Sequence, residues 1–184
     1  MSITTLVCSS HIHLSVALIL LLAESVHAET LTGRVVYVAD GDTVTVRDFA
    51  GARHQIRLAG IDAPELRQPF GGRSKQYLFR LVFDKAVSVE FVKRDDHGRI
   101  VGKIMVASPD ACPDASNTCP KTLDAGLAQL TVGLAWWYRY YAAEQSEEDR
   151  HRYEFAENEA RARKAGLWVE NEPVQPWEWR RRNK

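Results

Sequence analysis

The sequence predicts an α+β fold in which five short strands close into a barrel and three helices pack around it. Two observations favour this fold class. Over five short segments apolar residues are concentrated or alternate with polar ones, and turn residues separate these segments, as is typical of strands. Three other segments have helical spacing, and one of them lies between the third and fourth strands.

The first half of the chain begins as a three-stranded meander. In the third strand Ile56 and Leu58 face one way, while Gln55 and Arg57 face the other. The Asp-Gly-Asp sequence at 40–42 is a turn signal between the first two strands. The three predicted strands cover residues 31–38, 43–47 and 52–58.

The second half supplies two strands and all three helices. Ser74 is expected to cap the first helix, and Ser146 with Asp149 forms a capping-box pattern at the start of the last. Gly133 is expected to end the middle helix. The elements are a helix through 77–82, strands at 87–92 and 100–107 joined by a turn at 95–98, and helices at 123–132 and 146–164. Five short strands with one helix between the third and fourth predict a small barrel of the OB-fold type.

Residues 1–28 have the pattern of a signal peptide. The apolar run from Leu14 to Ala23 is too short to cross a bilayer, and Val26 and Ala28 are small residues where a signal peptidase cuts. An uncleaved anchor is the alternative, since residues 1–10 contain no Lys or Arg. Cleavage would give a periplasmic or secreted protein without stable membrane insertion, which we expect to be a monomer.

The remaining chain divides into a domain at 29–170 and a C-terminal tail at 171–184. In the tail, Trp177 and Trp179 are expected to dock, and residues 180–184 to be solvated. Without residues 1–28 the chain would have 24 basic and 23 acidic residues. Because many nucleic-acid-binding domains are strongly basic, attraction for phosphate would depend here on local placement of charge.

Two cysteines, Cys112 and Cys119, remain after the signal segment and flank a polar loop. In an oxidising compartment a single pair favours a disulfide. The alternative, half of a zinc site, lacks a second Cys or His pair to complete it.

Three short motifs carry residues suited to phosphodiester chemistry, although each alone has an ordinary structural explanation. Asp42 and Asp62 are hard oxygen ligands for Ca²⁺ or a similar cation. Glu65 could orient or deprotonate a water molecule. Arg57 and Arg99 could clamp a phosphate through paired N–H donors. Taken singly, Asp42 would belong to an ordinary β-turn, and Asp62 and Glu65 to a helix N-cap. Arg57 and Arg99 would be arginines on the solvated surface.

Together the motifs resemble the thermonuclease (staphylococcal nuclease) family over about residues 30–168. The matching segments are Asp40-Gly41-Asp42-Thr43, Arg57-Leu58, Asp62-Ala63-Pro64-Glu65 and Gly98-Arg99. The resemblance implies an OB-fold, dependence on Ca²⁺, and hydrolysis of DNA and RNA to 3′-phosphate products. It implies metal ligation by Asp42, Asp62 and the carbonyl of Ala63, catalysis by Arg57, Glu65 and Arg99, and supporting roles beside the metal for Asp40 and Thr43.

The sequence departs from the family's best-known member in the hairpin that contacts the nucleotide. Asp96 and His97 stand where that member has Lys and Tyr, and an acid there should repel phosphate. We expect His97 to contact substrate, together with Tyr138 and Tyr140 from the aromatic run at 136–141. Core packing is the alternative use of those aromatic residues. Two other functions remain open: a non-catalytic nucleic-acid-binding module, and an envelope protein with an incidental Ca²⁺ site.

Overall fold

The computed structural model describes residues 29–108 and 119–183. The predicted signal peptide and Cys112 lie outside the described residues, so the signal segment and the Cys112–Cys119 disulfide stay predictions. Cys119 itself is buried. No helix among the described residues is long and apolar enough to cross a membrane.

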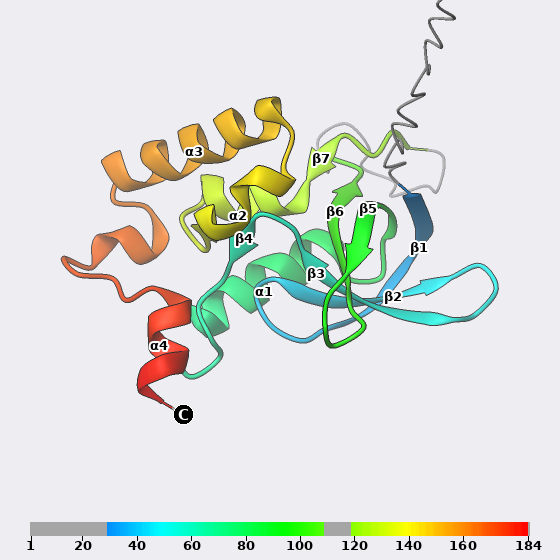
Figure 1. Cartoon of the computed structure of the whole chain (residues 1–184), viewed down its shortest axis with the longest axis horizontal. Helices are drawn as coiled ribbons and strands as arrows, with labels where there is room; N and C mark the ends of the chain where they lie inside the picture. The colour runs from blue at the N-terminus through cyan, green and yellow to red at the C-terminus, as the bar shows by residue number, and fades with distance from the viewer. Residues whose placement is uncertain (1–28, 109–118, 184) are drawn as a thin grey trace, which may run out of the picture.

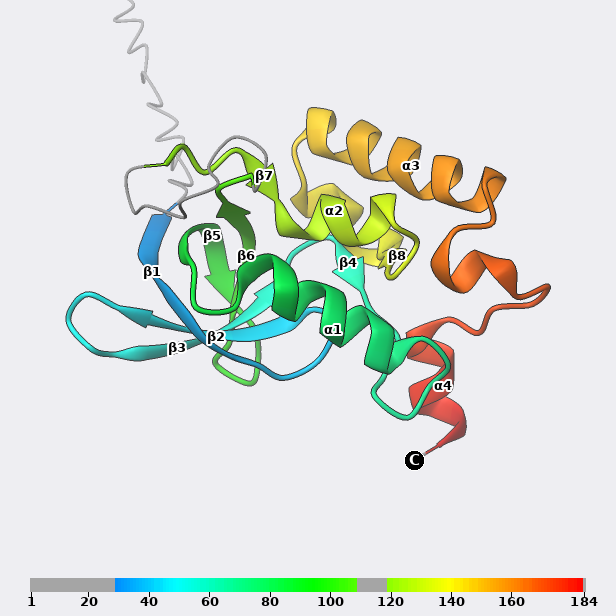
Figure 2. The same cartoon turned by 180° about the vertical axis from the view of Figure 1, so that it is seen from behind.

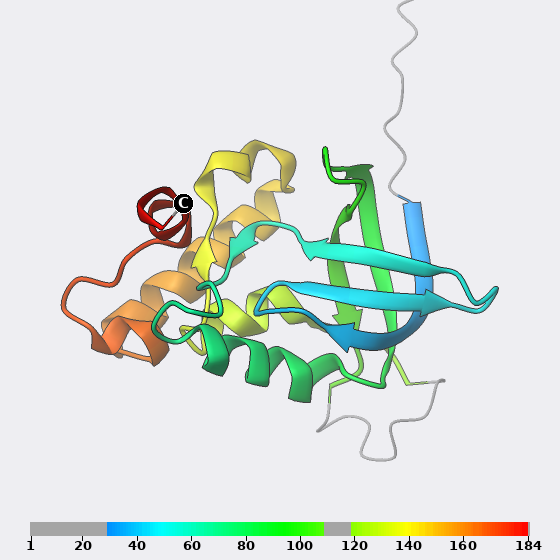
Figure 3. The ribbon, with the colours of Figure 1, turned by 90° about the horizontal axis from the view of Figure 1, so that it is seen from below.

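Five strands form the closed barrel that the sequence predicts (Figure 1). They are joined in the order β3-β2-β1-β5-β6, and β6 pairs back with β3 in parallel, with Arg57 opposite Val101. Figure 3 shows the strands from below, with the helices gathered beside them. The barrel strands are β1 (Glu29–Val38), β2 (Thr43–Asp48), β3 (Arg53–Leu58), β5 (Ala86–Arg94) and β6 (Ile100–Val106). Three two-residue strands are added to these: β4 (Ile61–Asp62), β7 (Leu123–Asp124) and β8 (Trp136–Trp137).

The predicted alternation decides which side chains fill the barrel. In β3, Ile56 and Leu58 are buried in the core, which leaves Arg57 on the opposite face of the strand. In β6 every second residue from Ile100 to Val106 is buried. Because the side-chain period of a strand is two, burying the apolar face places the polar face of β3 outside the barrel core.

The helices lie on one side of the barrel, and α2 packs against both α1 and α3 (Figures 1 and 2). The three predicted helices are α1 (Gly71–Val82), α2 (Ala125–Thr131) and α3 (Glu147–Ala162), and two 3₁₀ helices cover Arg139–Glu144 (η1) and Gly166–Val169 (η2). A fourth helix, α4 (Pro176–Arg182), follows.

The two predicted N-caps have different outcomes. The Ser146 hydroxyl accepts a hydrogen bond from the backbone N–H of Asp149 at 3.0 Å, as the capping-box pattern predicts. The Ser74 prediction was wrong, because α1 begins one turn earlier, at Gly71. Ser74 is instead buried, and its hydroxyl lies 3.2 Å from the side-chain nitrogen of Gln129.

The C-terminal segment is more ordered than the predicted tail. Residues 176–182 form α4, with Pro176 in its first turn, where the missing N–H of proline costs no helical hydrogen bond. Trp177 docks as predicted, with its ring centroid 5.9 Å from that of Trp136. Arg180 is exposed as predicted, but the prediction missed that its guanidinium donates hydrogen bonds to two carboxylates of the site described next.

Candidate active site

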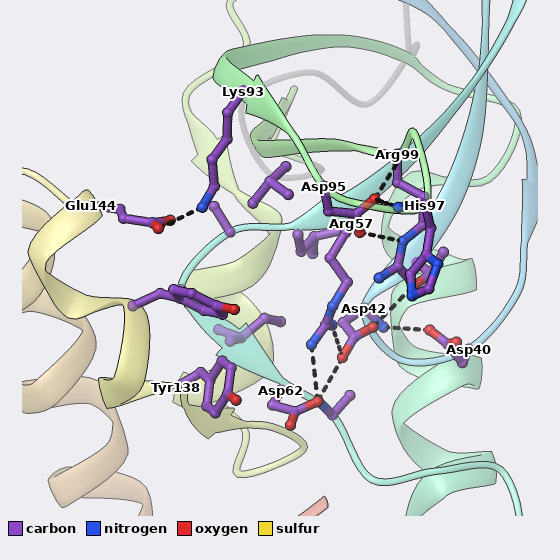
Figure 4. Close-up of a pocket in the computed structure, with 18 of the residues that line it drawn as sticks. Asp40, Asp42, Arg57, Asp62, Lys93, Asp95, His97, Arg99, Tyr138 and Glu144 are labelled. Carbon is purple, nitrogen blue, oxygen red and sulfur yellow. Dashed lines mark hydrogen bonds and ion pairs between the residues drawn. The ribbon is translucent and has the colours of Figure 1, made fainter. Parts of the chain in front are cut away.

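A cavity of about 480 Å³ lies where the end of β3, β4, the β5–β6 hairpin, η1 and α4 meet (Figure 4). Its lining includes all five residues in which the sequence predicts the chemistry to reside, namely Asp42, Arg57, Asp62, Glu65 and Arg99. These residues come from three separate parts of the chain. The fold therefore brings the three motifs into one place.

Arg57 lies at the centre of the acidic part of the cavity. Its side chain projects from β3 on the face opposite the core and is mostly buried. The guanidinium forms an ion pair with Asp42, and its Nη2 donates to Asp62 Oδ1 at 3.0 Å (Figure 4). One guanidinium thus contacts both predicted metal-ligating carboxylates, so these carboxylates are close neighbours.

The backbone and the predicted supporting residues fix the position of Asp42. Its Oδ2 accepts a hydrogen bond from the backbone N–H of Ala63 at 2.7 Å, and its Oδ1 accepts one from the Thr43 hydroxyl at 3.0 Å. Asp40 Oδ1 accepts from the backbone N–H of Asp42 at 3.0 Å. Asp40 and Thr43 therefore hold the loop that carries Asp42, and their roles beside a metal stay predictions.

The acids of this cluster hold more negative charge than Arg57 alone offsets. Burial, together with the charge of Asp42, raises the pKa of Asp40 to about 6. Burial also raises the pKa of Asp62 above its usual value, although Arg180 and Arg57 oppose the shift. Burial would raise the pKa of Asp42 as well, but the charge of Arg57 and the hydrogen bonds from Ala63, Arg57 and Thr43 together outweigh burial and lower that pKa. Such a cluster favours a bound positive group.

The donor set fits a hard cation. Asp42, Asp62 and the Ala63 carbonyl offer only oxygen atoms, as Ca²⁺ requires, and water would complete its coordination. Within the part of the chain that the structure describes, no group of three or more His, Cys, Asp or Glu side chains is placed to hold a metal. The predicted set contains only two carboxylates, so that finding leaves it untested.

A positively charged side chain that the sequence prediction missed is already bound there. Arg180 of α4 donates to both oxygens of Asp62, at 3.1 and 2.8 Å, and to Glu65 Oε1 at 2.7 Å. No motif signals this role, because Arg180 lies in a run of three arginines that resembles a solvated tail. The contact shows that Asp62 and Glu65 together accommodate a cationic group.

Arg99 forms the far wall of the cavity, on the β5–β6 hairpin. Its Nε donates to Asp95 Oδ2 at 2.7 Å, and Asp95 Oδ1 accepts from the backbone N–H groups of His97 and Arg99. His97 and Asp96 line the same cavity. The hairpin thus presents one guanidinium and the predicted substrate-contacting histidine toward the acids, with Arg99 held by an internal ion pair.

The aromatic run at 136–141 divides between the core and the site. Trp136 and Trp137 are buried, which is the core-packing alternative. Tyr138, which is predicted to contact substrate, lines the cavity, and so does Tyr141, which the sequence prediction did not select. Tyr140 is 78% exposed and is not among the residues that line the cavity. The predicted contact of Tyr140 with substrate therefore has no support from its position.

Comparison with known proteins agrees with this geometry. Residues 55–170 match the family described as Staphylococcal nuclease homologue. A protein named micrococcal nuclease from Shigella flexneri is 39% identical over 152 residues, which cover 83% of this chain and 82% of that protein. A protein named as an endonuclease from Escherichia coli is 38% identical over 150 residues, covering 82% of this chain and 85% of that protein. Protein ParB of Escherichia coli is 36% identical over 164 residues, or 89% of this chain and 86% of its own length. The matched region contains Arg57, Asp62, Glu65 and Arg99, and on this basis the chain belongs to the staphylococcal nuclease family.

Proposed function

We propose that this chain is a Ca²⁺-dependent nuclease that hydrolyses phosphodiester bonds of DNA and RNA and leaves 3′-phosphate products. The observation that carries the proposal is the meeting of Asp42, Asp62 and Glu65 with Arg57 and Arg99 around one cavity. Family membership and the names of the similar proteins support it.

The substrate's phosphate would lie between the acids and the hairpin. Arg57 and Arg99 supply planar guanidinium groups that can each donate two hydrogen bonds to phosphate oxygens. Tyr138 and Tyr141 line the same cavity, and we propose that one of these two rings stacks on a neighbouring base. Stacking on an aromatic ring tolerates any base, at about 1–3 kcal/mol per base, which suits a nuclease without sequence preference. Because stacking requires an unpaired base, we propose that flexible or single-stranded regions are preferred.

The proposed reaction is an in-line attack of water on phosphorus. Glu65, half-exposed at the cavity, orients the water and accepts its proton. The bond between phosphorus and the 5′ oxygen breaks, and that oxygen leaves with the bonding electrons and takes up a proton. Arg57 and Arg99 donate hydrogen bonds to the phosphate oxygens, whose charge increases in the transition state. Asp42, Asp62 and the Ala63 carbonyl would hold Ca²⁺, which supplies further positive charge when bound.

We also propose that the protein acts outside the cytoplasm, in the periplasm or after secretion, as a monomer. The signal-peptide pattern at 1–28 and the cysteine pair Cys112 and Cys119 support this location. An oxidising compartment would allow the disulfide, whose short loop would add roughly 2–3 kcal/mol in the chain-entropy picture.

Cleavage of supercoiled plasmid DNA and of a single-stranded RNA tests the proposal, with wild type and Glu65→Gln assayed in Ca²⁺ and in EGTA. We expect wild type to cleave both in Ca²⁺ and neither in EGTA, with activity restored by added Ca²⁺. Glu65→Gln should keep the circular dichroism of wild type and lose about 10²-fold or more of its turnover. Glu154→Gln is the matched control, because Glu154 is exposed on α3 and does not line the cavity.

The other outcomes of this assay are equally informative. Turnover of Glu65→Gln equal to that of wild type would remove Glu65 from the mechanism. Binding of nucleic acid in a gel shift without cleavage would replace the proposal by a non-catalytic binding module. Absence of both binding and cleavage would favour the remaining alternative, a structural protein of the envelope.

A further inference from the structure

The C-terminal helix α4 is docked on the wall of the candidate active site. The ring centroid of Trp177 lies 5.2 Å from that of Tyr138, a cavity-lining residue, and 5.9 Å from that of Trp136. Just before the helix, the Val174 carbonyl accepts a hydrogen bond from the buried side chain of Gln68 at 2.6 Å. Figure 2 shows α4 beside the N-terminal end of α1 and the loop that precedes α1. The position of Arg180 is therefore set by packing of the whole segment.

From that position the Arg180 guanidinium binds the Asp62 carboxylate. Both carboxylate oxygens accept from its guanidinium, and Oδ1 also accepts from Arg57. The Asp62 side chain is only 1% exposed, so it has little access to water. A divalent cation that binds Asp62 would meet the positive charge of Arg180 at both carboxylate oxygens, so the cation and Arg180 compete for this side chain.

The two arginines differ in how easily they can move. Arg57 projects from β3 near the end of that strand, is mostly buried, and pairs with Asp42 as well. The Arg180 side chain is 42% exposed and lies near the end of a seven-residue terminal helix. Arg180 can move into solvent by rotation of its partly exposed side chain, whereas movement of the mostly buried Arg57 side chain would leave the buried Asp42 without its positive partner.

We propose that Arg180 is an internal counter-cation of Asp62 and Glu65 that competes with Ca²⁺ for Asp62 and thereby sets the affinity of the site for metal. This inference rests on the proposed function. In the absence of metal, Arg180 neutralises the two acids, and on metal binding it leaves them. The affinity of the site for Ca²⁺ is therefore lower than Asp42, Asp62 and the Ala63 carbonyl alone would give.

Calorimetric titration of the full chain with Ca²⁺, without nucleic acid, tests the proposal directly. Arg180→Gln should bind Ca²⁺ about tenfold or more tightly than wild type, because hydrogen bonds between charged groups no longer have to be broken. Arg181→Gln removes the same charge from the adjacent position, where the side chain is 70% exposed and pairs with Glu178. This control should bind Ca²⁺ within about twofold of wild type, since charge alone at the surface is screened by salt. Arg180→Lys, which keeps the charge and loses the paired donors, should lie between Arg180→Gln and wild type.

Hydrogen exchange at residues 176–182 gives a second measurement that does not depend on affinity. Addition of Ca²⁺ to wild type should speed exchange in α4, because the contact between Arg180 and the acids is lost. In Arg180→Gln exchange should already be fast without Ca²⁺ and should change little when it is added. Protection of α4 that is equal in wild type with and without Ca²⁺ would overturn the release of Arg180.

The outcomes separate this inference from the proposed function. Equal Ca²⁺ affinity of Arg180→Gln and Arg181→Gln, or weaker binding by Arg180→Gln, overturns the inference even if the chain cleaves DNA. Tighter binding by Arg180→Gln in a chain that cleaves no nucleic acid supports the inference and refutes the nuclease. If no variant binds Ca²⁺, both the competition and the metal dependence of the nuclease are wrong.

Discussion

Gly133 and Gly166 lie against one another so closely that a Cβ atom added to Gly166 would lie 2.1 Å from the Gly133 carbonyl oxygen. Both have positive φ, 68° and 55°. The same carbonyl accepts a hydrogen bond from the Leu167 N–H at 2.8 Å. This contact joins the end of α2 to η2, which carries Trp168 onto Trp136, the residue opposite Asp62 in the β4–β8 pair. The packing of the two glycines thus supports the strand that holds Asp62.

Gly166→Ala should lower the free energy of unfolding by at least about 2 kcal/mol, because it adds a clash with backbone to a left-handed conformation. Urea unfolding followed by tryptophan fluorescence measures the change. Gly72→Ala is the control, since a Cβ there meets nothing within 4 Å. In α1 that substitution should be neutral or stabilise by up to about 1 kcal/mol. Equal stabilities of the two variants would contradict the close approach.

Arg57→Gln should destabilise the metal-free protein far more than the Ca²⁺-bound protein. Without Arg57, Asp42 and the buried Asp62 lose their shared positive partner, at a cost of about 3–5 kcal/mol typical of a broken buried ion pair. Bound Ca²⁺ would replace much of that charge. Urea unfolding in EGTA and in saturating Ca²⁺ gives the comparison, with Arg47→Gln, at an exposed position of β2, as control. A loss of the same size in both conditions would show that Ca²⁺ does not bind these acids.

Asp95→Asn should make the loss of folding stability at low pH smaller than in wild type. Burial would raise the pKa of Asp95, but hydrogen bonds from the Arg99 side chain and from backbone N–H groups outweigh it, so the pKa lies below 3.8. A carboxyl with a lowered pKa stabilises the folded state above 3.8, and this contribution is lost as the pH falls through the folded value. Wild type should therefore lose more stability below pH 3.8 than Asp95→Asn does.

The exposed neighbour Asp96 supplies the control for that measurement. Asp96→Asn removes the same charge without removing a hydrogen bond found in the structure, so its unfolding curve against pH should follow that of wild type. If Asp95→Asn also follows wild type, the ion pair with Arg99 does not stabilise the hairpin.

Tyr153→Phe should cost about 1–2 kcal/mol of stability, because the buried Tyr153 hydroxyl donates to Asp124 Oδ2 at 2.8 Å. Asp124 caps α2 through its other oxygen, which accepts from the N–H groups of Gly126 and Leu127. Thermal unfolding measures the loss. Tyr140→Phe, at a tyrosine 78% exposed, should leave the melting temperature within about 1 °C of wild type.

The barrel and the acidic cluster could be predicted because both depend on local patterns. Alternation of apolar residues assigned Ile56 and Leu58 to the core and thereby placed Arg57 on the other face. The motifs around Asp42, Asp62 and Glu65 lie in turns or at strand ends, where short sequences fix the backbone. The pairs β1–β2, β2–β3 and β5–β6 join neighbouring barrel strands, whereas β1–β5 and β3–β6, which close the barrel, join strands far apart in the sequence.

The role of Arg180 and the choice among the tyrosines could not be predicted in this way. Arg180 meets Asp62 across 118 positions of the chain, and although the docking of Trp177 was predicted, nothing in the sequence indicates that Arg180 faces the site. Tyr138 precedes the 3₁₀ helix η1, and Tyr140 and Tyr141 lie within it, with a kink at Tyr141. Neither a period of two nor one of 3.6 therefore identifies the face toward the cavity. Both features depend on packing between segments far apart in sequence.

The parallel pairing of β3 with β6 has a consequence for how the protein loses activity when the barrel opens locally. It places Arg57 beside Val101, two residues beyond Arg99, so the last seam of the barrel also sets the spacing of the two arginines. A molecule in which only the β3–β6 pairing had opened would keep most of its strands and helices. It would be largely folded but catalytically inactive. Catalysis should therefore disappear on mild heating before any optical signal of unfolding, and should return on cooling as soon as the seam closes.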